Sequence, residues 1–526
     1  MTSEHRIAEA PAGRFDGEDL DGVRRWRGIR YALAPTGALR WRDPVAAPDG
    51  GAAAVPTRSY GPAAPQQSNP AVPLGPDTAT DEDCLFLNVW APESASASDS
   101  ADARPVMVWI HGGAYTFGSA SQPLFDGAAL VRAGDVVLVT INYRLGALGF
   151  LDLSGVAPGE FDGNLALKDV LLALRWVQRN IAAFGGDPGR VTVFGESAGG
   201  GLVTTLLATP SAEGLFHRAI AQSSPVSSVY GPERALSVAE RFLVEAGGSG
   251  GSGGPAETGT AIAARLRELP VDEIVRAGTA VYASVPDDAP GTLAFAPVVD
   301  GALVPEAPVT VLSEGRGIPV PLIIGTNRDE ASLFKFMKSP LIPITGDRLE
   351  RMFDDMRAEL PGADLPTESQ VLGAYEGARH RALGLGIARD IGFRMPSLWA
   401  AEGHARVAPV WFYRFDHSSP FLHLIGLGAT HATELPYLWG NLDGGPKDPT
   451  FRLGGRRIAR RISARMQQRW TGFAHGRDPE ADGAAQWLPY TADARDTLVI
   501  DGIDRSAPDL DRALRLGWGD RVLTFE

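Results

Sequence analysis

The chain has 526 residues, of which 44% are hydrophobic and 21% are charged, an ordinary composition for a globular protein. Its formal net charge of −14 at pH 7 argues against nucleic acid or an anionic membrane surface as a partner. No stretch approaches the roughly 20 consecutive apolar residues of a membrane-spanning helix, and the first residues, MTSEHRIAEAPAG, have no apolar run typical of a secretory signal.

Predicted strands and helices alternate along the chain. Residues 27–44 are expected to be ordered but irregular and residues 46–79 to form a loop, because prolines and glycines recur in both. Residues 165–184 have apolar positions at helical spacing, with Asn164 as the expected N-cap. Strands are predicted at residues 83–90, 106–110, 136–141, 191–194, 218–222, 320–325 and 410–415. This alternation predicts an α/β protein with a large, mostly parallel central sheet flanked by helices.

Three segments interrupt or follow this pattern. Residues 247–254, GGSGGSGG, read as a flexible surface loop rather than a domain linker, because the segment after them still supplies strands. Residues 347–406 are expected to form a helical cap. Residues 455–475 form a basic amphipathic helix, for which we favour packing of an apolar face over membrane-surface binding. That face comprises Ile458, Ile462, Met466, Trp470 and Phe473. We expect one domain, residues 1–526.

A candidate nucleophile lies at residues 191–201, VTVFGESAGGG. Four strand-forming residues lead into the pattern Gly195-x-Ser197-x-Gly199, and a helical segment of small residues follows. A sharp turn between a strand and a helix exposes the serine hydroxyl, and the glycines allow the two elements to approach closely. The beginning of the helix offers unpaired N–H groups to a developing oxyanion.

A serine needs a base, and the chain has nine histidines from which to choose. His111 adjoins glycines and is better placed to shape that loop. His417, His423 and His431 all follow a predicted strand, and of these we favour His431. The sequence Gly-Ala-Thr precedes His431 and would project its ring, and ELPYLWG then re-enters the fold.

The base needs a carboxylate to orient it, and the strand at residues 320–325 leads to Asp329 and Glu330. Either would lie beyond the carboxyl end of a strand, where open α/β sheets carry their sites. The order Ser197, acid, His431 is that of α/β-hydrolases. For the oxyanion, the segment WIHGGA at residues 109–114 follows a strand and has backbone small enough to approach a carbonyl, and the N–H of Ala198 completes the set.

Seven motifs resemble the type-B carboxylesterase family, which includes cholinesterases and bacterial para-nitrobenzyl esterases. They are EDCLFLNVW (82–90), WIHGGAY (109–115), NYRLGALGFL (142–151), FGGDPGRVTVFGESAGG (184–200), PVVDG (297–301), GTNRDE (325–330) and HATELPY (431–437). The resemblance runs from about Gly28 to Pro479 and implies an α/β-hydrolase fold with helical insertions over the site.

The resemblance also implies roles for particular residues. Ser197 would be the acylated nucleophile, Glu330 rather than Asp329 the acid, and His431 the base. Further implied roles are oxyanion donation by Gly113, Ala114 and Ala198, and a set of buried polar groups beneath the histidine made by Glu196 and Glu434 with Ser224 nearby.

The chain departs from the family pattern in two places. Cys84 is the only cysteine, and the upstream stretch GPAAPQ (61–66) lacks the partner with which secreted members pair it, which favours a cytoplasmic location. The same region lacks the tryptophan that holds choline in cholinesterases, so nothing supports a choline-ester preference.

We therefore expect a serine esterase that hydrolyses a small-molecule ester through an acyl-enzyme, without cofactor or metal. Activity should fall as His431 protonates, with a pKa near about 6.5. The alternatives are a lipase, an amide or carbamate hydrolase, and a non-catalytic binding protein on the same fold. We expect a monomer or a weak dimer, with no nucleic acid and no membrane as partner.

Overall fold

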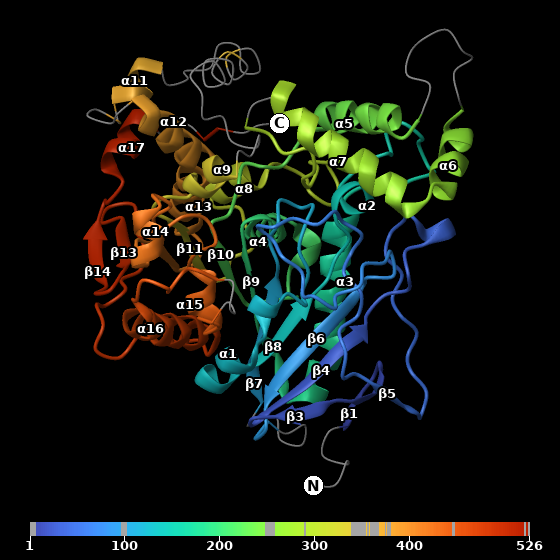
Figure 1. The fold of residues 1–526 in the computed structure, drawn as a ribbon, viewed down its shortest axis with the longest axis horizontal. Helices are drawn as coiled ribbons and strands as arrows, with labels where there is room; N and C mark the ends of the chain where they lie inside the picture. Colours follow the sequence, from blue (N-terminus) through green and yellow to red (C-terminus); the bar gives the residue numbers. More distant parts are fainter. Residues whose placement is uncertain are drawn as a thin grey trace.

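The computed structural model describes residues 7–95, 103–247, 258–288, 291–337, 354, 357, 368–373, 375, 380–443, 448–519 and 522–523. Within these residues, eleven strands form one sheet (Figure 1). In spatial order they are β14 (Arg505–Pro508), β13 (Asp496–Ile500), β12 (Val410–Phe415), β11 (Leu322–Asn327), β10 (Arg218–Gln222), β9 (Gly186–Glu196), β7 (Arg104–Ile110), β8 (Val137–Ile141), β6 (Phe86–Pro92), β4 (Val23–Arg30) and β3 (Glu18–Leu20).

The strands from β13 to β8 pair in parallel, whereas β14, β6, β4 and β3 join both edges in antiparallel pairs. The fold is therefore the predicted α/β-hydrolase architecture. Gln222 lies opposite Glu196 on one side and opposite Gly325 on the other, so β9, β10 and β11 end at nearly the same level. Their carboxyl ends thus form one edge, where parallel sheets carry their sites.

Side chains of the central strands alternate between two cores. In β7, Val106, Val108 and Ile110 face one cluster, while Met107 and Trp109 face the other. The two-residue period of a strand places successive side chains on opposite faces of the sheet. Both faces are therefore covered, and the strand's continuous apolar sequence follows from that.

Helices cover both faces. The helix α3 contributes its apolar residues to the first core and α16 to the second. Figure 1 shows α5, α6 and α7 together at the top of the view and α15 with α16 at the lower left. The described helices are α1 (Ala128–Gly134), α2 (Gly146–Gly149), α3 (Leu165–Asn180), α4 (Ala198–Leu207), α5 (Pro232–Glu245), α6 (Gly259–Glu268), α7 (Val271–Asp288), α8 (Pro308–Ser313), α9 (Ser332–Phe336), α11 (Glu368–Gly373), α12 (His380–Arg389), α13 (Met395–His404), α14 (Pro420–Leu424), α15 (Leu435–Trp439), α16 (Arg456–Ala474) and α17 (Arg512–Trp518).

The N-terminal region has more strands than its sequence suggests. The strands β1 (Ile7–Ala10), β2 (Gly13–Asp16) and β5 (Ala54–Pro56) form a separate small sheet. The expected loop at residues 46–79 includes β5, and the expected irregular stretch at 27–44 begins inside β4. Such short strands, rich in charged residues and glycine, have little of the alternation that identifies a strand.

Two predicted helices differ in detail from the structure. Asn164 has a left-handed φ of 52° and makes no side-chain cap for α3. Its amide donates instead to Val298 O at 2.8 Å and to Asp300 Oδ2 at 2.9 Å, so it ties the start of the helix to a distant loop. In α16, Ile462, Met466, Trp470 and Phe473 are buried as predicted, but Ile458 is 43% exposed, because its neighbour Ala459 occupies the inward position in the first turn.

The predicted cap is only partly described. Residues 347–353, 355, 356, 358–367, 374 and 376–379 lie outside the described residues, as do residues 248–254 of the predicted glycine-serine loop. Within 347–406, α13 packs against β11 and β12, so this part lies in the helical layer on the sheet. No helix in the described part of the chain is long and apolar enough to cross a membrane.

Candidate active site

Ser197 lies at the turn between β9 and α4. Its φ of 56° and ψ of −126° are a strained combination for a residue with a side chain. A β-carbon at Gly199 would lie 2.0 Å from Ile110 O, and one at Gly195 would lie 2.6 Å from the backbone of Gly199. Only glycine therefore lets the strand and the helix approach closely enough to form this turn.

His431 lies in the loop before α15, with its ring facing Ser197. Its Nε2 is 2.7 Å from Ser197 Oγ, and its Nδ1 is 2.7 Å from Glu330 Oε2. With the proton on Nδ1 donated to Glu330, Nε2 is free to accept from the serine hydroxyl. Phe393 and Phe334 pack against the imidazole at centroid distances of 4.8 and 5.2 Å and shield it from solvent.

Glu330 is fully buried and holds its position through three contacts. Its second oxygen, Oε1, accepts from Ser223 Oγ and from the backbone N–H of Asn327, both at 2.6 Å. Asp329, the other candidate acid, turns away, since its Oδ2 accepts from the N–H of Ala429 at 3.0 Å. The structure therefore brings Glu330, and not Asp329, to the histidine.

The backbone N–H groups of Gly113, Ala114 and Ala198, the predicted oxyanion donors, lie after β7 and at the start of α4. Gly113 and Ala114 follow β7 with φ values of 121° and 51°, and the N–H groups of Thr116 and Phe117 fix this loop by donating to Gly113 O. No hydrogen bond of the N–H groups of Gly113 or Ala114 to a described acceptor is found. Ala198 is the first residue of α4, so its N–H has no partner within the helix.

His111 shapes this loop and is not the base. Its ring stacks on Tyr143 at a centroid distance of 4.5 Å, and Tyr143 Oη donates to His111 O at 2.5 Å. Burial lowers the pKa of His111 to about 4, so the ring is neutral near pH 7. His417 and His423 also lie outside the site: the first is 3.1 Å from Asp501, and the second lies in α14.

Two further glutamates lie beside the histidine. Glu196 Oε1 is 3.2 Å from His431 Nε2, and burial raises the pKa of Glu196 to about 8. Glu434 is fully buried and accepts from Gln222 Nε2 at 3.0 Å and Asn327 Nδ2 at 2.6 Å. Burial raises the pKa of Glu434, against the effect of its hydrogen bond from Asn327. The predicted pair thus lies beside the imidazole.

Sequence reasoning missed three residues of this network. The hydroxyl in contact with Glu330 belongs to Ser223, which has a left-handed φ of 46°. Ser224, the residue named from the sequence, directs its hydroxyl to Thr204 Oγ1 at 3.0 Å. Gln222 and Asn327 were also missed, although each ends a strand next to β9 or β10, a position that the predicted parallel sheet offered as a signal.

Comparison with known proteins identifies the family. The model of the carboxylesterase family matches residues 4–507 of the chain. The chain belongs to the carboxylesterase family.

Relatives of this carboxylesterase include the para-nitrobenzyl esterase of Bacillus subtilis (strain 168), which is 34% identical over 94% of this chain and 95% of its own length. The phenmedipham hydrolase of Pseudarthrobacter oxydans is 33% identical over 94% of each chain. Among solved structures, a thermophilic para-nitrobenzyl esterase superposes with a TM-score of 0.84 at 33% identity, covering 98% of this chain and 100% of its own. A carboxylesterase of Geobacillus stearothermophilus gives 0.82 at 34% identity, with the same coverage. The chain is a carboxylic ester hydrolase.

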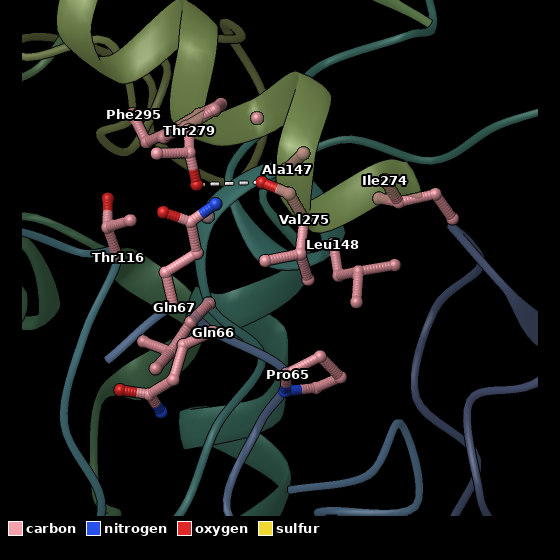
Figure 2. A pocket seen from close by; sticks show the side chains of 13 residues that line it. Pro65, Gln66, Gln67, Thr116, Ala147, Leu148, Ile274, Val275, Thr279 and Phe295 are labelled. Carbon is pink, nitrogen blue, oxygen red and sulfur yellow. Dashed lines mark hydrogen bonds between the residues drawn. The ribbon is translucent and has the colours of Figure 1, made fainter. Parts of the chain in front are cut away.

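A shallow hollow lies beside the loop of Gly113 and Ala114 (Figure 2). Gln66, Gln67, Thr116 and Thr279 bring polar groups to it, and residues of α2 and α7, together with Pro65, Leu145 and Phe295, complete its lining. The Thr116 hydroxyl donates to Ala114 O at 3.0 Å, so the hollow adjoins the back of this loop. Ser197 and His431 are not among the residues that line it.

Proposed function

We propose that Ser197 is the nucleophile of this carboxylesterase, that His431 is its base, and that Glu330 orients the base. The observation that carries the proposal is the line of two 2.7 Å contacts from Ser197 Oγ through His431 to Glu330. Serine is a weak nucleophile until a neighbouring base accepts its proton, and this geometry supplies the base in the correct tautomer.

The reaction follows from these contacts. Ser197 Oγ attacks the ester carbonyl while His431 Nε2 takes its proton, and a tetrahedral oxyanion forms. The intermediate collapses when the bond to the alcohol breaks, and His431 returns the proton to the departing alcohol oxygen. Water, deprotonated in turn by His431, then attacks the acyl-enzyme and releases the acid and Ser197.

Gly113, Ala114 and Ala198 donate their N–H groups to the oxyanion in this proposal. Each such donor lowers the barrier by roughly 2.7–4 kcal/mol, because it is oriented before charge develops. Glu330 accepts the hydrogen bond from His431 Nδ1 and stabilises the imidazolium that forms during each step. Glu196 and Glu434 provide buried polar support for the histidine, and Ser224, buried next to Ser223, contacts Thr204.

The substrate is a small-molecule ester with an apolar group, because the walls beside His431 are apolar. Phe393 forms a small cluster there with Ala331 and Ala388, and further side chains pack against it. They are Ala114, Tyr282, Leu293, Phe334 and Leu385. Such a wall suits an aliphatic or aromatic portion of an ester better than a charged one.

Labelling and hydrolysis by the Ser197→Ala variant test the catalytic roles. Wild type should hydrolyse a series of para-nitrophenyl esters and gain the mass of one phosphonyl group on Ser197 after treatment with an organophosphonate. Ser197→Ala should lose at least ~10³-fold in rate and all labelling, because it lacks the nucleophile. Labelling of the variant equal to that of wild type would refute the assignment.

Monomeric or weakly dimeric assembly and a cytoplasmic location stay predictions, as does the division into a single domain. We propose that the enzyme needs no partner protein, because all the residues in the proposed roles come from one chain. Light scattering of the purified protein across a hundredfold range of concentration tests the assembly. A constant dimer mass across that range would contradict a monomer or weak dimer.

A further inference from the structure

Asn327 is the last residue of β11, three positions before the acid. It is fully buried, and its backbone N–H donates to Glu330 Oε1 at 2.6 Å. This bond folds the turn back on itself, so that the carboxylate lies over the strand end that precedes it. The position of the acid is therefore set partly by Asn327.

The side chain of Asn327 reaches the other two parts of the site. Its Nδ2 donates to the carbonyl oxygen of Thr430 at 2.8 Å and to Glu434 Oε2 at 2.6 Å. Thr430 directly precedes His431, so the first bond fixes the loop that carries the base. Both neighbours are acceptors, which requires the NH₂ group of the amide, with its two donors, to face them.

The orientation of this amide has a cost. Its oxygen, Oδ1, is buried and has no hydrogen-bond partner among the described residues. An unpaired buried acceptor is unfavourable, because it has lost its hydrogen bonds to water without replacing them. The Asn327 amide thus donates to two acceptors while its own oxygen stays unpaired. We attribute this arrangement to the positioning of the two acceptors, because it does not favour the stability of the fold.

Arg394 holds Asn327 from behind. Its Nη2 donates to Asn327 O at 2.9 Å and its Nε to Thr326 Oγ1 at 2.5 Å, while Nη1 contacts Asp511. Arg394 is the last residue of a π-helical turn, Asp390–Arg394. Phe393, the residue before Arg394 in this turn, packs against His431. Such turns are rare and frequently occur at functional sites. The end of β11 is thus held rigidly.

We propose that Asn327 is a positioning residue of the esterase, holding the acid, the loop of the base and Glu434 in one fixed arrangement. The inference rests on the proposed roles of Ser197, Glu330 and His431 and goes beyond them. Asn327 does not touch the reacting atoms. It acts by setting where His431 lies and how much negative charge surrounds the ring.

The charge around His431 comes from several elements. Glu196 at the end of β9, Glu330 after β11 and Glu434 before α15 all raise the pKa of the ring, and the buried phenol of Tyr413 in β12 lies near the same carboxylates. Arg394 supplies a cation behind Asn327. The hydrogen bond from Asn327 stabilises the charged form of Glu434, so removing or reversing this donor should change the charge that the imidazole experiences.

Two substitutions should therefore have opposite effects on the pH profile. In Asn327→Ala, Glu434 loses a donor and takes up a proton more readily, so the pKa of His431 falls and the acid limb of kcat/KM moves to lower pH. In Asn327→Asp, an added carboxylate faces Glu434, and the limb moves to higher pH. Both variants should lose about 10- to 100-fold in kcat with KM changed less than about threefold, because a misplaced base affects the chemical step.

Rates are to be expressed per serine titrated with an organophosphonate, so that unfolded protein is not counted. Asn327→Ser, whose hydroxyl keeps one donor, should lie between wild type and Asn327→Ala, and it provides a second variant if alanine prevents folding. Asn88→Ala is the matched control, since Asn88 is also a buried asparagine with a strand contact, to Thr140, outside the site. It should leave the limb unchanged.

The inference would be overturned if the acid limb of the kcat/KM profile stayed at the wild-type pH in all Asn327 variants. It would also be overturned if their kcat stayed within threefold of wild type. These outcomes are distinct from failure of the proposed function. If Ser197→Ala is inactive while the Asn327 variants resemble wild type, only the role of Asn327 is wrong. If Ser197→Ala keeps its activity, the catalytic assignment itself is wrong.

Discussion

His431 Nε2 lies 3.2 Å from Glu196 Oε1 as well as 2.7 Å from Ser197 Oγ, so one ring nitrogen has two partners. The carboxyl group of Glu196 comes from the residue directly before the nucleophile, at the end of the same strand. Among the described residues, its Oε1 has no hydrogen-bond donor. Glu196 is therefore free to interact with whichever protonation state of the ring forms during catalysis.

The acid limb of the pH profile should lie above the ordinary histidine pKa of about 6.5. Burial lowers the pKa of His431, but the nearby carboxylates, Glu196 and Glu330 foremost, outweigh burial and raise it. Only the neutral ring can accept the serine proton, so activity rises with pH through this raised pKa. This corrects the value near 6.5 expected from the sequence.

Glu196→Gln should move that limb to lower pH, because it removes a group that stabilises the imidazolium. The measurement is kcat/KM for a soluble para-nitrophenyl ester between pH 4 and pH 10. Glu160→Gln makes the same change of charge at a site beside Arg267 and should leave the limb in place. A limb that is identical in wild type and Glu196→Gln would show that Glu196 does not interact with the ring.

Glu330→Gln should lower kcat by about 10³–10⁴-fold. An uncharged amide neither stabilises the imidazolium nor holds the ring in the correct tautomer, and the analogous change in serine proteases costs about 10⁴-fold. Asp329→Asn is the matched control in the same turn, because Asp329 contacts Ala429 and Arg328 instead of the histidine. If Asp329→Asn lost more activity than Glu330→Gln, the identity of the acid would be wrong.

Asp169→Asn should destabilise the fold by about 3–5 kcal/mol, because it leaves the buried Arg144 without a counter-charge. The two side chains are 0% and 3% exposed and meet through contacts of 2.7 and 2.8 Å. The change is read from the free energy of unfolding in urea. Asp49→Asn breaks the exposed pair with Arg179, which solvent screens, and should leave the free energy of unfolding nearly unchanged. Equal losses for both variants would contradict this account.

The turn that carries Ser197, the proposed nucleophile, was predictable from sequence because its geometry is local. The strand, the glycines and the small-residue helix are contiguous, and together they allow only a sharp turn with Ser197 at its apex. The central strands were predictable for a similar reason. Their unbroken apolar runs indicate burial on both faces, and the structure shows a core on each side of the sheet.

The partners of Ser197 depend on contacts between residues far apart in the chain. His431 is 234 positions from the serine and 101 from Glu330, and the choice among His417, His423 and His431 came down to the composition of a loop. Whether Asp329 or Glu330 faces the ring depends on the direction in which a turn projects adjacent side chains. The resemblance to a family made that choice, and the residues alone left it open.

The supporting network was decided by the tertiary structure alone. Ser223, Gln222 and Asn327 meet because β9, β10 and β11 pair in a parallel register that ends them at one level. A shift of one residue in such a register would direct each side chain to the opposite face of the sheet. The local sequence thus determined the turn that carries Ser197 and the layers that bury its strand. The register between strands determined that Ser223, Gln222 and Asn327 contact Glu330 and Glu434, because that register depends on packing across the whole sheet.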